Sequence, residues 1–189
     1  MMHASRCALL FAALAGAPAL ALQAQAAPNR AAAVEYRQQF LIDLDTLHAK
    51  VIALAKAVPA DKYTWRPMPG TRTFGEVFMH IASEYLLYNP ASFGGARSPL
   101  VKPGQAGIQA FEQNSSKDSV LKYLAAGIAY SHSALMAIPP DSLVGKRKMF
   151  GRELNIFETG IGMTADLHEH LGQLIAYARM NAIVPPWSK

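Results

Sequence analysis

Apolar residues recur at helical spacing in four segments of the chain, and this pattern limits the fold more than any other feature. Clusters of proline and glycine separate the segments, and no stretch alternates apolar and polar residues for long enough to build a sheet. Four amphipathic helices in 189 residues predict an all-α fold, an antiparallel four-helix bundle. The predicted helices span residues 31–57, 73–89, 116–138 and 155–181.

Two capping boxes mark the starts of predicted helices. Thr73 is followed three residues later by Glu76, and Asn155 is followed in the same way by Glu158. In this pattern each side chain accepts a hydrogen bond from a backbone amide that the first helical turn leaves free. The second and fourth helices are therefore expected to begin directly after Thr73 and Asn155.

Two connections between the helices differ in character. Residues 92–115 are rich in glycine and proline, so we expect a long surface crossover between the second and third helices, with a short helical turn in its second half. Residues 146–154 are short and basic, and we expect them to be extended.

Residues 1–26 have the pattern of a secretory signal peptide. A positively charged start, which ends at Arg6, precedes an apolar, alanine-rich run, and Ala24-Gln25-Ala26 is a small-x-small cleavage pattern. The apolar run is shorter than the ~20 residues that a membrane span needs, so cleavage after Ala26 is expected rather than a membrane anchor. The mature domain would then cover residues 27–189, in a periplasmic or secreted protein.

The single cysteine, Cys7, lies inside this signal segment. The mature chain would therefore have no thiol for catalysis, for disulfides or for a cysteine-based zinc site. Loss of Arg6 with the segment lowers the formal net charge from +5 by one. A modest positive charge without a run of basic residues fits solubility better than nucleic-acid binding.

His80 in the second helix is the first candidate for a metal ligand. Glu76 and Glu84 lie four residues before and after it, so the three side chains share one helix face. Histidine is the commonest metal ligand, and carboxylates one turn away can orient such a ligand or act as bases. Ordinary i,i+4 pairs on a half-exposed face give the same pattern.

The fourth helix carries two histidines on opposite flanks of its apolar stripe, His168 and His170. A helix turns about 100° per residue, so the two cannot point the same way. His170 shares its flank with Asp166, Gln173 and Tyr177. An aspartate and a histidine at i,i+4 can hold one ion together, although plain surface pairs have the same spacing. Periodicity slightly favours His170.

Five short motifs follow one another along the mature chain: Tyr63-x-Trp65-Arg66-Pro67, Thr73-Phe74-Gly75-Glu76-x-x-x-His80-Ile81-Ala82, Glu169-His170-Leu171-Gly172-Gln173, Tyr177-x-Arg179 and Val184-Pro185-Pro186. In this combination they resemble the DinB/YfiT-like superfamily over essentially the whole mature chain. The resemblance implies a four-helix bundle with a metal site, usually of three histidines, at one end of a pocket. One ligand comes from the second helix, and two, four residues apart, come from the fourth.

By this resemblance His80 matches the ligand of the second helix, and His170 matches the last ligand of the fourth. The position four residues before His170 is Asp166, where the family pattern has histidine. A carboxylate there would complete a set of two histidines and one carboxylate, which suits zinc or iron. The replacement equally fits a site that has weakened or lost its metal. The predicted ligands are thus His80, Asp166 and His170, with a divalent metal, zinc or nickel, as the expected cofactor.

The family implied by the resemblance includes thiol-dependent transferases and isomerases, and many of its members are described only as metal-dependent hydrolases. A bound metal would lower the pKa of a water molecule, and Glu76, Glu84 and Tyr177 are the candidate catalytic residues beside it. A low-molecular-weight thiol is less plausible outside the cytoplasm, which favours either hydrolysis of an unknown small-molecule substrate or binding alone.

Two alternatives from other functional classes stay open. One is a metal-free module that binds a small ligand, and the other is a dimerising helical bundle without catalytic activity. A homodimer is left open as a partner, and no nucleic acid is expected.

Overall fold

A computed structural model describes residues 29–149 and 151–188 of the chain. The fold is mostly helical, with one small two-stranded sheet. The predicted signal peptide, residues 1–26, lies outside the described residues.

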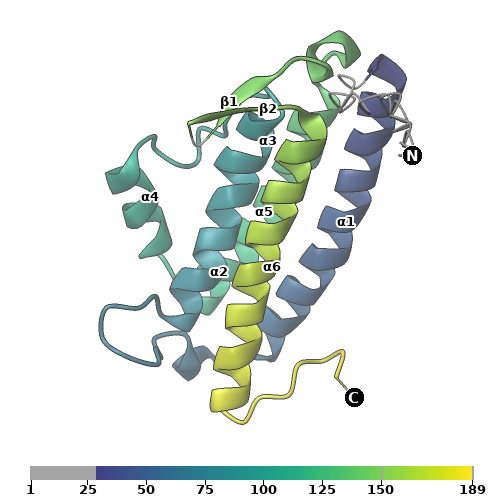
Figure 1. The fold of residues 1–189 in the computed structure, drawn as a ribbon. Coiled ribbons are helices and arrows are strands. Elements are labelled where there is room, and N and C mark those ends of the chain that lie inside the picture. Colours follow the sequence, from purple (N-terminus) through teal and green to yellow (C-terminus); the bar gives the residue numbers. More distant parts are fainter. Residues whose placement is uncertain (1–28, 150, 189) are drawn as a thin grey trace, which may run out of the picture.

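Four long helices run side by side (Figure 1). Helices α1 and α2 each contact both α5 and α6. The chain descends along α1, rises along α2, crosses back, rises along α5 and descends along α6 (Figure 1). The bounds are Arg30–Ala57 for α1, Phe74–Ser83 for α2, Lys117–Met136 for α5 and Ile156–Met180 for α6.

The capping residues that the sequence indicates begin three of these helices. Thr73 and Glu76 form a complete capping box at the start of α2, and Asn155 and Glu158 form another at the start of α6. The Ser116 side chain accepts a hydrogen bond from the amide of Ser119 and caps α5. The predicted helix starts are confirmed, because each depends only on neighbouring residues.

The second helix continues past its predicted end at residue 89. A π-helical segment, η2 (Glu84–Tyr88), follows α2 and leads into α3 (Asn89–Ser92). Pro90 has no amide hydrogen, so it cannot bond to the carbonyl of Leu86. The amide of Ser98 donates to that carbonyl instead, at 2.8 Å. The proline therefore changes the hydrogen-bond pattern of the helix without ending it.

The crossover from α3 to α5 contains a helix, α4 (Gln105–Glu112), which packs against α2. The sequence predicted a surface connection with only a short helical turn here. The basic segment before α6 forms a hairpin of two short antiparallel strands, β1 (Arg147–Met149) and β2 (Arg152–Leu154). Its strands are extended, as expected, but are too short for a period-two pattern to reveal the pairing.

Buried apolar side chains fill the space between the long helices. Phe74 and Phe78 stack at 5.5 Å between ring centroids, and Phe40 packs on Phe93 at 4.6 Å. Two 3₁₀ helices occur in the connections, at Ala60–Lys62 and Pro140–Leu143. Within the described ranges, every helix is too short or too polar to span a membrane.

Candidate metal centre

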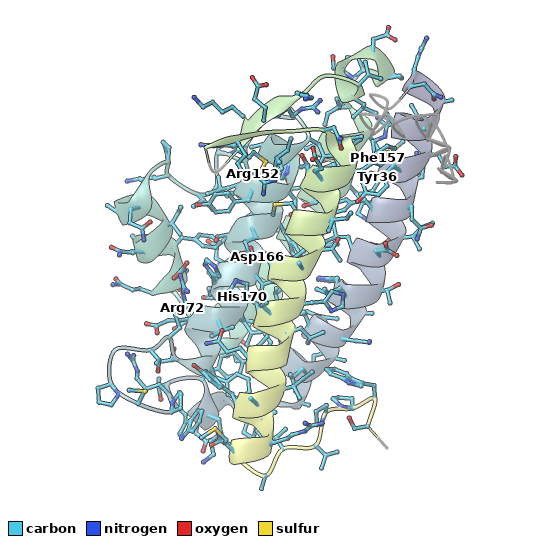
Figure 2. The ribbon with its side chains drawn as sticks, viewed as in Figure 1. Tyr36, Arg72, Arg152, Phe157, Asp166 and His170 are labelled. Atoms are coloured by element: carbon cyan, nitrogen blue, oxygen red, sulfur yellow. The ribbon has the colours of Figure 1, made fainter. Side chains whose placement is uncertain are left out.

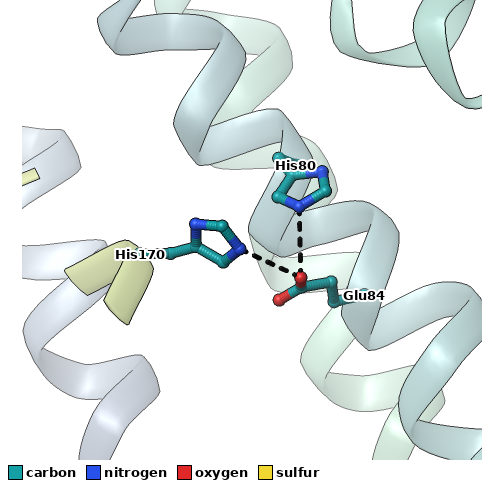
Figure 3. Close-up of side chains that lie close together, drawn as sticks. All are labelled: His80, Glu84 and His170. Carbon is teal, nitrogen blue, oxygen red and sulfur yellow. Dashed lines mark ion pairs between the residues drawn. The ribbon is translucent and has the colours of Figure 1, made fainter. Parts of the chain in front are cut away.

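Two histidines and a glutamate from different helical segments meet between α2 and α6. One carboxylate oxygen of Glu84, Oε1, lies 3.2 Å from Nε2 of His80 and 3.3 Å from Nε2 of His170 (Figure 3). The two imidazole rings are nearly perpendicular, with their centroids 4.6 Å apart. One candidate ligand atom from each residue lies within 4.8 Å of the other two, so the group can hold a metal ion.

Helix geometry places these three side chains together. His80 near the end of α2 and Glu84 at the start of η2 are four residues apart, so they lie on one face, which is turned toward α6. His170 approaches from α6 on the opposite side of the gap (Figure 3). The site therefore depends on how α2 and α6 pack against each other.

Glu84 is the most buried member of the group, with 2% of its surface exposed. Burial alone would raise its pKa, but hydrogen bonds to His170 and His80 outweigh burial and lower the pKa of Glu84 to about 2. Its second oxygen, Oε2, is buried and has no hydrogen-bond partner among the described residues. A buried carboxylate oxygen without a partner is costly, and a cation at this point would satisfy it.

Glu112, the last residue of α4, contacts the second ring nitrogen of His80. Its Oε1 lies 2.6 Å from Nδ1 of His80, and Arg72 donates to both of its oxygens, at 2.9 and 3.3 Å. Burial alone would lower the pKa of His80, but hydrogen bonds to Glu112 and Glu84 raise it to about 9. When Nδ1–H donates to Glu112, the lone pair of neutral His80 is on Nε2, which faces Glu84.

The donor set fits a small divalent ion. Two ligand atoms bound tetrahedrally to zinc at 2.0–2.1 Å lie roughly 3.3 Å apart, close to the 3.2 and 3.3 Å between Glu84 and the two histidines. Imidazole and carboxylate ligands suit zinc, nickel and iron. Three protein ligands leave a coordination position open, as catalytic rather than structural zinc sites do.

A pocket of about 540 Å³ opens beside the group. His80 and Glu84 lie at one end, and the β1–β2 hairpin covers the other. Helix α6 forms one wall through a row of residues from Glu158 to Glu169. A small molecule in this pocket can therefore reach the His80–Glu84–His170 group from the hairpin side.

Comparisons with known proteins identify the family. A model of the DinB superfamily matches residues 43–174, which is more than half of the chain. The chain belongs to the DinB superfamily. A search among curated proteins finds no match.

Two solved DinB-like proteins share the fold of this DinB-superfamily chain. The crystal structure of a DinB-like protein (YjoA) from Bacillus subtilis matches with a TM-score of 0.55 and 17% identity, over 77% of this chain and 93% of that one. The crystal structure of a DinB-like protein from Bacillus cereus matches with a TM-score of 0.53 and 17% identity, over 79% of this chain and 95% of that one. At this identity the likeness concerns the fold alone.

Of the three ligands predicted for this DinB-superfamily chain, the structure brings His80 and His170 into one group. The third, Asp166, lies at the edge, with its Oδ1 3.7 Å from Nε2 of His170 and about half of its side chain exposed. Glu84, predicted as a base, supplies the third ligand atom of the group. Burial and the neighbouring Glu84 raise the pKa of Asp166 to about 6. The assignment of Asp166 as a ligand stays a prediction.

The other two predicted catalytic residues are engaged elsewhere. Glu76 accepts the amide hydrogen bond of Thr73 at 2.7 Å in the capping box, so its carboxylate points toward the start of α2. The Tyr177 hydroxyl accepts a hydrogen bond from Gln173 and donates one to the carbonyl of Arg72, at 3.0 and 3.2 Å. Neither side chain lines the pocket beside His80. The exposed His168 also points away from the group, in agreement with the wheel argument.

Sequence reasoning missed Glu112. It lies 32 residues from His80 in the crossover, where only a short helical turn was predicted, and no local pattern connects the two. The only signal was the presence of an acidic residue at the end of the short apolar stretch near Ile108, which becomes α4.

Proposed function

We propose that this DinB-superfamily chain is an exported, metal-dependent enzyme, a hydrolase or transferase that acts on a small molecule. We also propose that α1, α2, α5 and α6 form a four-helix bundle that is antiparallel between α1 and α5 and between α2 and α6. The long crossover that contains α4 makes its second and third members, α2 and α5, run in the same direction (Figure 1). The observation that carries the enzymatic proposal is the position of the Glu84 carboxylate oxygen, within 3.3 Å of both His80 and His170.

In this proposal His80, Glu84 and His170 hold a divalent ion, zinc or nickel. When bound, such an ion lowers the pKa of a water molecule and polarises a substrate oxygen or sulfur. Glu112 keeps the proton of His80 on Nδ1, so that Nε2 is available as a ligand. The buried position of Glu84 restricts water around the group and strengthens its electrostatic interactions.

Asp166 is the best-placed proton acceptor in the pocket. Its pKa of about 6 lies near neutrality, which suits a general base. Its carboxylate lines the pocket beside the histidine group, so it can take a proton from a water or substrate hydroxyl there. Besides the metal, hydrolysis needs a base and a water molecule but no thiol cosubstrate. It therefore suits the periplasmic or secreted location that we propose from the signal peptide.

A metal-free small-ligand-binding bundle is the second candidate, and one observation favours it. The three members of the group already pair with one another, because Glu84 is ionised and His80 is held protonated by its carboxylate partners. Such a buried ion-pair cluster can persist without a metal. A homodimer remains compatible with both candidates.

The test is elemental analysis of protein purified without a polyhistidine tag from metal-replete medium. We expect about one equivalent of divalent metal in the wild-type protein. His80→Ala and Glu84→Gln should lose it, whereas His168→Ala, an exposed histidine on the same helix as His170, should keep it. Metal-free wild-type protein, or equal metal content in all four proteins, would overturn the enzymatic proposal in favour of the metal-free one.

A further inference from the structure

We propose that the β1–β2 hairpin selects the substrate: the Arg152 guanidinium binds a carboxylate at one end of an elongated molecule whose other end reacts at the His80–Glu84–His170 group. This inference rests on the proposed function and adds the class of substrate. Figure 2 shows Arg152 beneath the hairpin, on the same side of α6 as Asp166 and His170.

Strand alternation directs Arg152 toward the pocket. In the hairpin register Met149 pairs with Arg152, and Lys148 pairs with Glu153. Successive side chains of a strand point to opposite faces, so Met149, Arg152 and Leu154 share the face that lines the pocket. Lys148 and Glu153 occupy the outer face and line no part of it.

The Arg152 guanidinium is free to bind a ligand. Among the described residues, no carboxylate oxygen lies within 4.0 Å of it. The other arginine of the hairpin, Arg147, donates instead to the carbonyls of Ser142 and Gly145. A guanidinium presents parallel N–H groups that match the two oxygens of a carboxylate. Arg152 is therefore suited to bind an anionic group in the pocket.

The carboxylates that line the pocket have other partners or face solvent. Glu84 lies against the two histidines, and Glu158 accepts the amide hydrogen bond of Asn155 at 2.8 Å. Asp166 pairs with His170. Glu169 is exposed on α6. Among the residues that line this pocket, Arg152 is the one arginine or lysine, and it is therefore the side chain at the hairpin end that can pair with an anionic ligand.

The wall of the pocket that α6 forms suits an elongated molecule. Asp166 follows Thr159 by seven positions of α6, which corresponds to about 10 Å of helix. Gly162 lies between them, and a Cβ added there would meet nothing within 4 Å. Thr159 lines the pocket beyond Gly162, and its buried hydroxyl has no partner among the described residues. Tyr88 and Met163 offer apolar contact to its middle.

The probes for the test are three octanoyl hydroxamates whose far ends carry a carboxylate, a neutral carboxamide or an ammonium group. The hydroxamate binds zinc, and the chain is long enough to reach from the metal group to the hairpin. Dissociation constants are measured by calorimetry on zinc-loaded protein. We expect the carboxylate probe to bind roughly five- to tenfold more tightly than the carboxamide, since Arg152 is exposed and a charge-assisted hydrogen bond at an exposed arginine is of this size. The ammonium probe should bind most weakly.

Matched variants test whether Arg152 causes the preference for the carboxylate probe and whether the probes pass over Gly162. Arg152→Gln should abolish the difference between the carboxylate and carboxamide probes, whereas Lys148→Gln, which removes the same charge from the outer face, should keep it. Gly162→Leu should block all three probes. Gly172→Leu, at a position of the same helix where a Cβ also meets nothing, should block none.

Two results separate failure of this inference from failure of the proposed function. Zinc content is measured on every variant, and Arg152→Gln and Gly162→Leu should bind zinc as the wild type does. If zinc and the hydroxamates bind but the carboxylate gives no advantage, or the ammonium probe binds best, the substrate class is wrong and the metal centre stands. If wild-type protein binds no zinc, the proposed function fails first.

Discussion

Nδ1 of His80 lies 2.6 Å from Oε1 of Glu112, across the interface between α2 and the crossover helix α4. Two nitrogens of the Arg72 side chain donate hydrogen bonds to the same carboxylate. A carboxylate behind a histidine fixes the tautomer and the orientation of the ring, and raises its strength as a ligand. The crossover between the second and third long helices thus contributes to the centre that we propose to bind metal.

Replacing Glu112 by Gln should weaken zinc binding by about 10- to 100-fold, the range seen when a partner behind a metal-bound histidine is lost. Competition titration against a chelator measures the effect. Because Glu112 raises the pKa of His80, the variant should also bind zinc with a pH midpoint shifted to lower pH. Glu153→Gln, which removes a carboxylate from the outer face of the hairpin, should change neither quantity. An unchanged pH midpoint in Glu112→Gln would show that Glu112 does not act through His80.

Stability of the metal-free protein should depend on pH in a way that identifies His80. Its pKa rises from 6.5 to about 9 on folding, so protonated His80 stabilises the fold fully below pH 6.5, and this contribution is lost as pH rises to 9. The lowered pKa of Glu84 acts in the opposite direction, since its contribution is lost as pH falls from 4.5 toward 2. Chemical unfolding across this range should show a decline between pH 6.5 and 9.

The variant His80→Gln separates this decline from other titrations, since it should lack the decline above pH 6.5. Saturating zinc should also remove it, because the metal displaces the proton from His80. A decline of equal size in His80→Gln would assign it to another group.

Replacing Asp166 by His restores the histidine that the family pattern has four residues before His170. We expect zinc binding to tighten by roughly tenfold or more, because a further imidazole reaches the ion. Catalytic turnover should fall, since the proposed proton acceptor is lost and the open coordination position is filled. Thr164→His, which adds a histidine elsewhere on α6, should leave zinc affinity unchanged. Weaker zinc binding in Asp166→His would contradict this expectation, and loss of zinc from Asp166→Ala would show that Asp166 is itself a ligand.

Two buried tyrosines offer a matched test of hydrogen bonding in the core. The Tyr85 hydroxyl is buried without a partner among the described residues, whereas that of Tyr63 donates to the carbonyl of Ala55 at 2.7 Å. Tyr63→Phe should lower the free energy of unfolding by about 1 kcal/mol or somewhat more, and Tyr85→Phe should leave it unchanged or raise it by up to about 1 kcal/mol. Urea unfolding measures both, and a large loss in Tyr85→Phe would reveal a partner for its hydroxyl.

Helix starts were predictable because their causes are local. Thr73 and Asn155 each bond to amides within three residues, so the sequence alone contains both partners. The continuation of the second helix through Pro90 was not predictable in this way. It depends on the amide of Ser98 reaching the carbonyl of Leu86, a contact that exists only once the crossover has folded back.

Part of the candidate site could also be inferred from the spacing of residues within single helices. His80 and Glu84 share a face by spacing alone. The helical wheel favoured His170 over His168 only slightly, because the two lie on opposite flanks of the apolar stripe. What spacing cannot supply is the distance between helices. Glu84 takes the position between both histidines because α2 packs against α6. Glu112 joins them through α4, where the sequence predicted only a short helical turn.

The π-helical segment Glu84–Tyr88 has a consequence for comparing this chain with its relatives. One wide turn holds an extra residue relative to an α-helix, so positions before and after it are out of phase by about 100°. An alignment that runs through this helix without a gap would pair Tyr88, at the pocket wall, with residues that face elsewhere in a relative whose helix is regular. Equivalent pocket positions should therefore be matched separately on the two sides of Glu84.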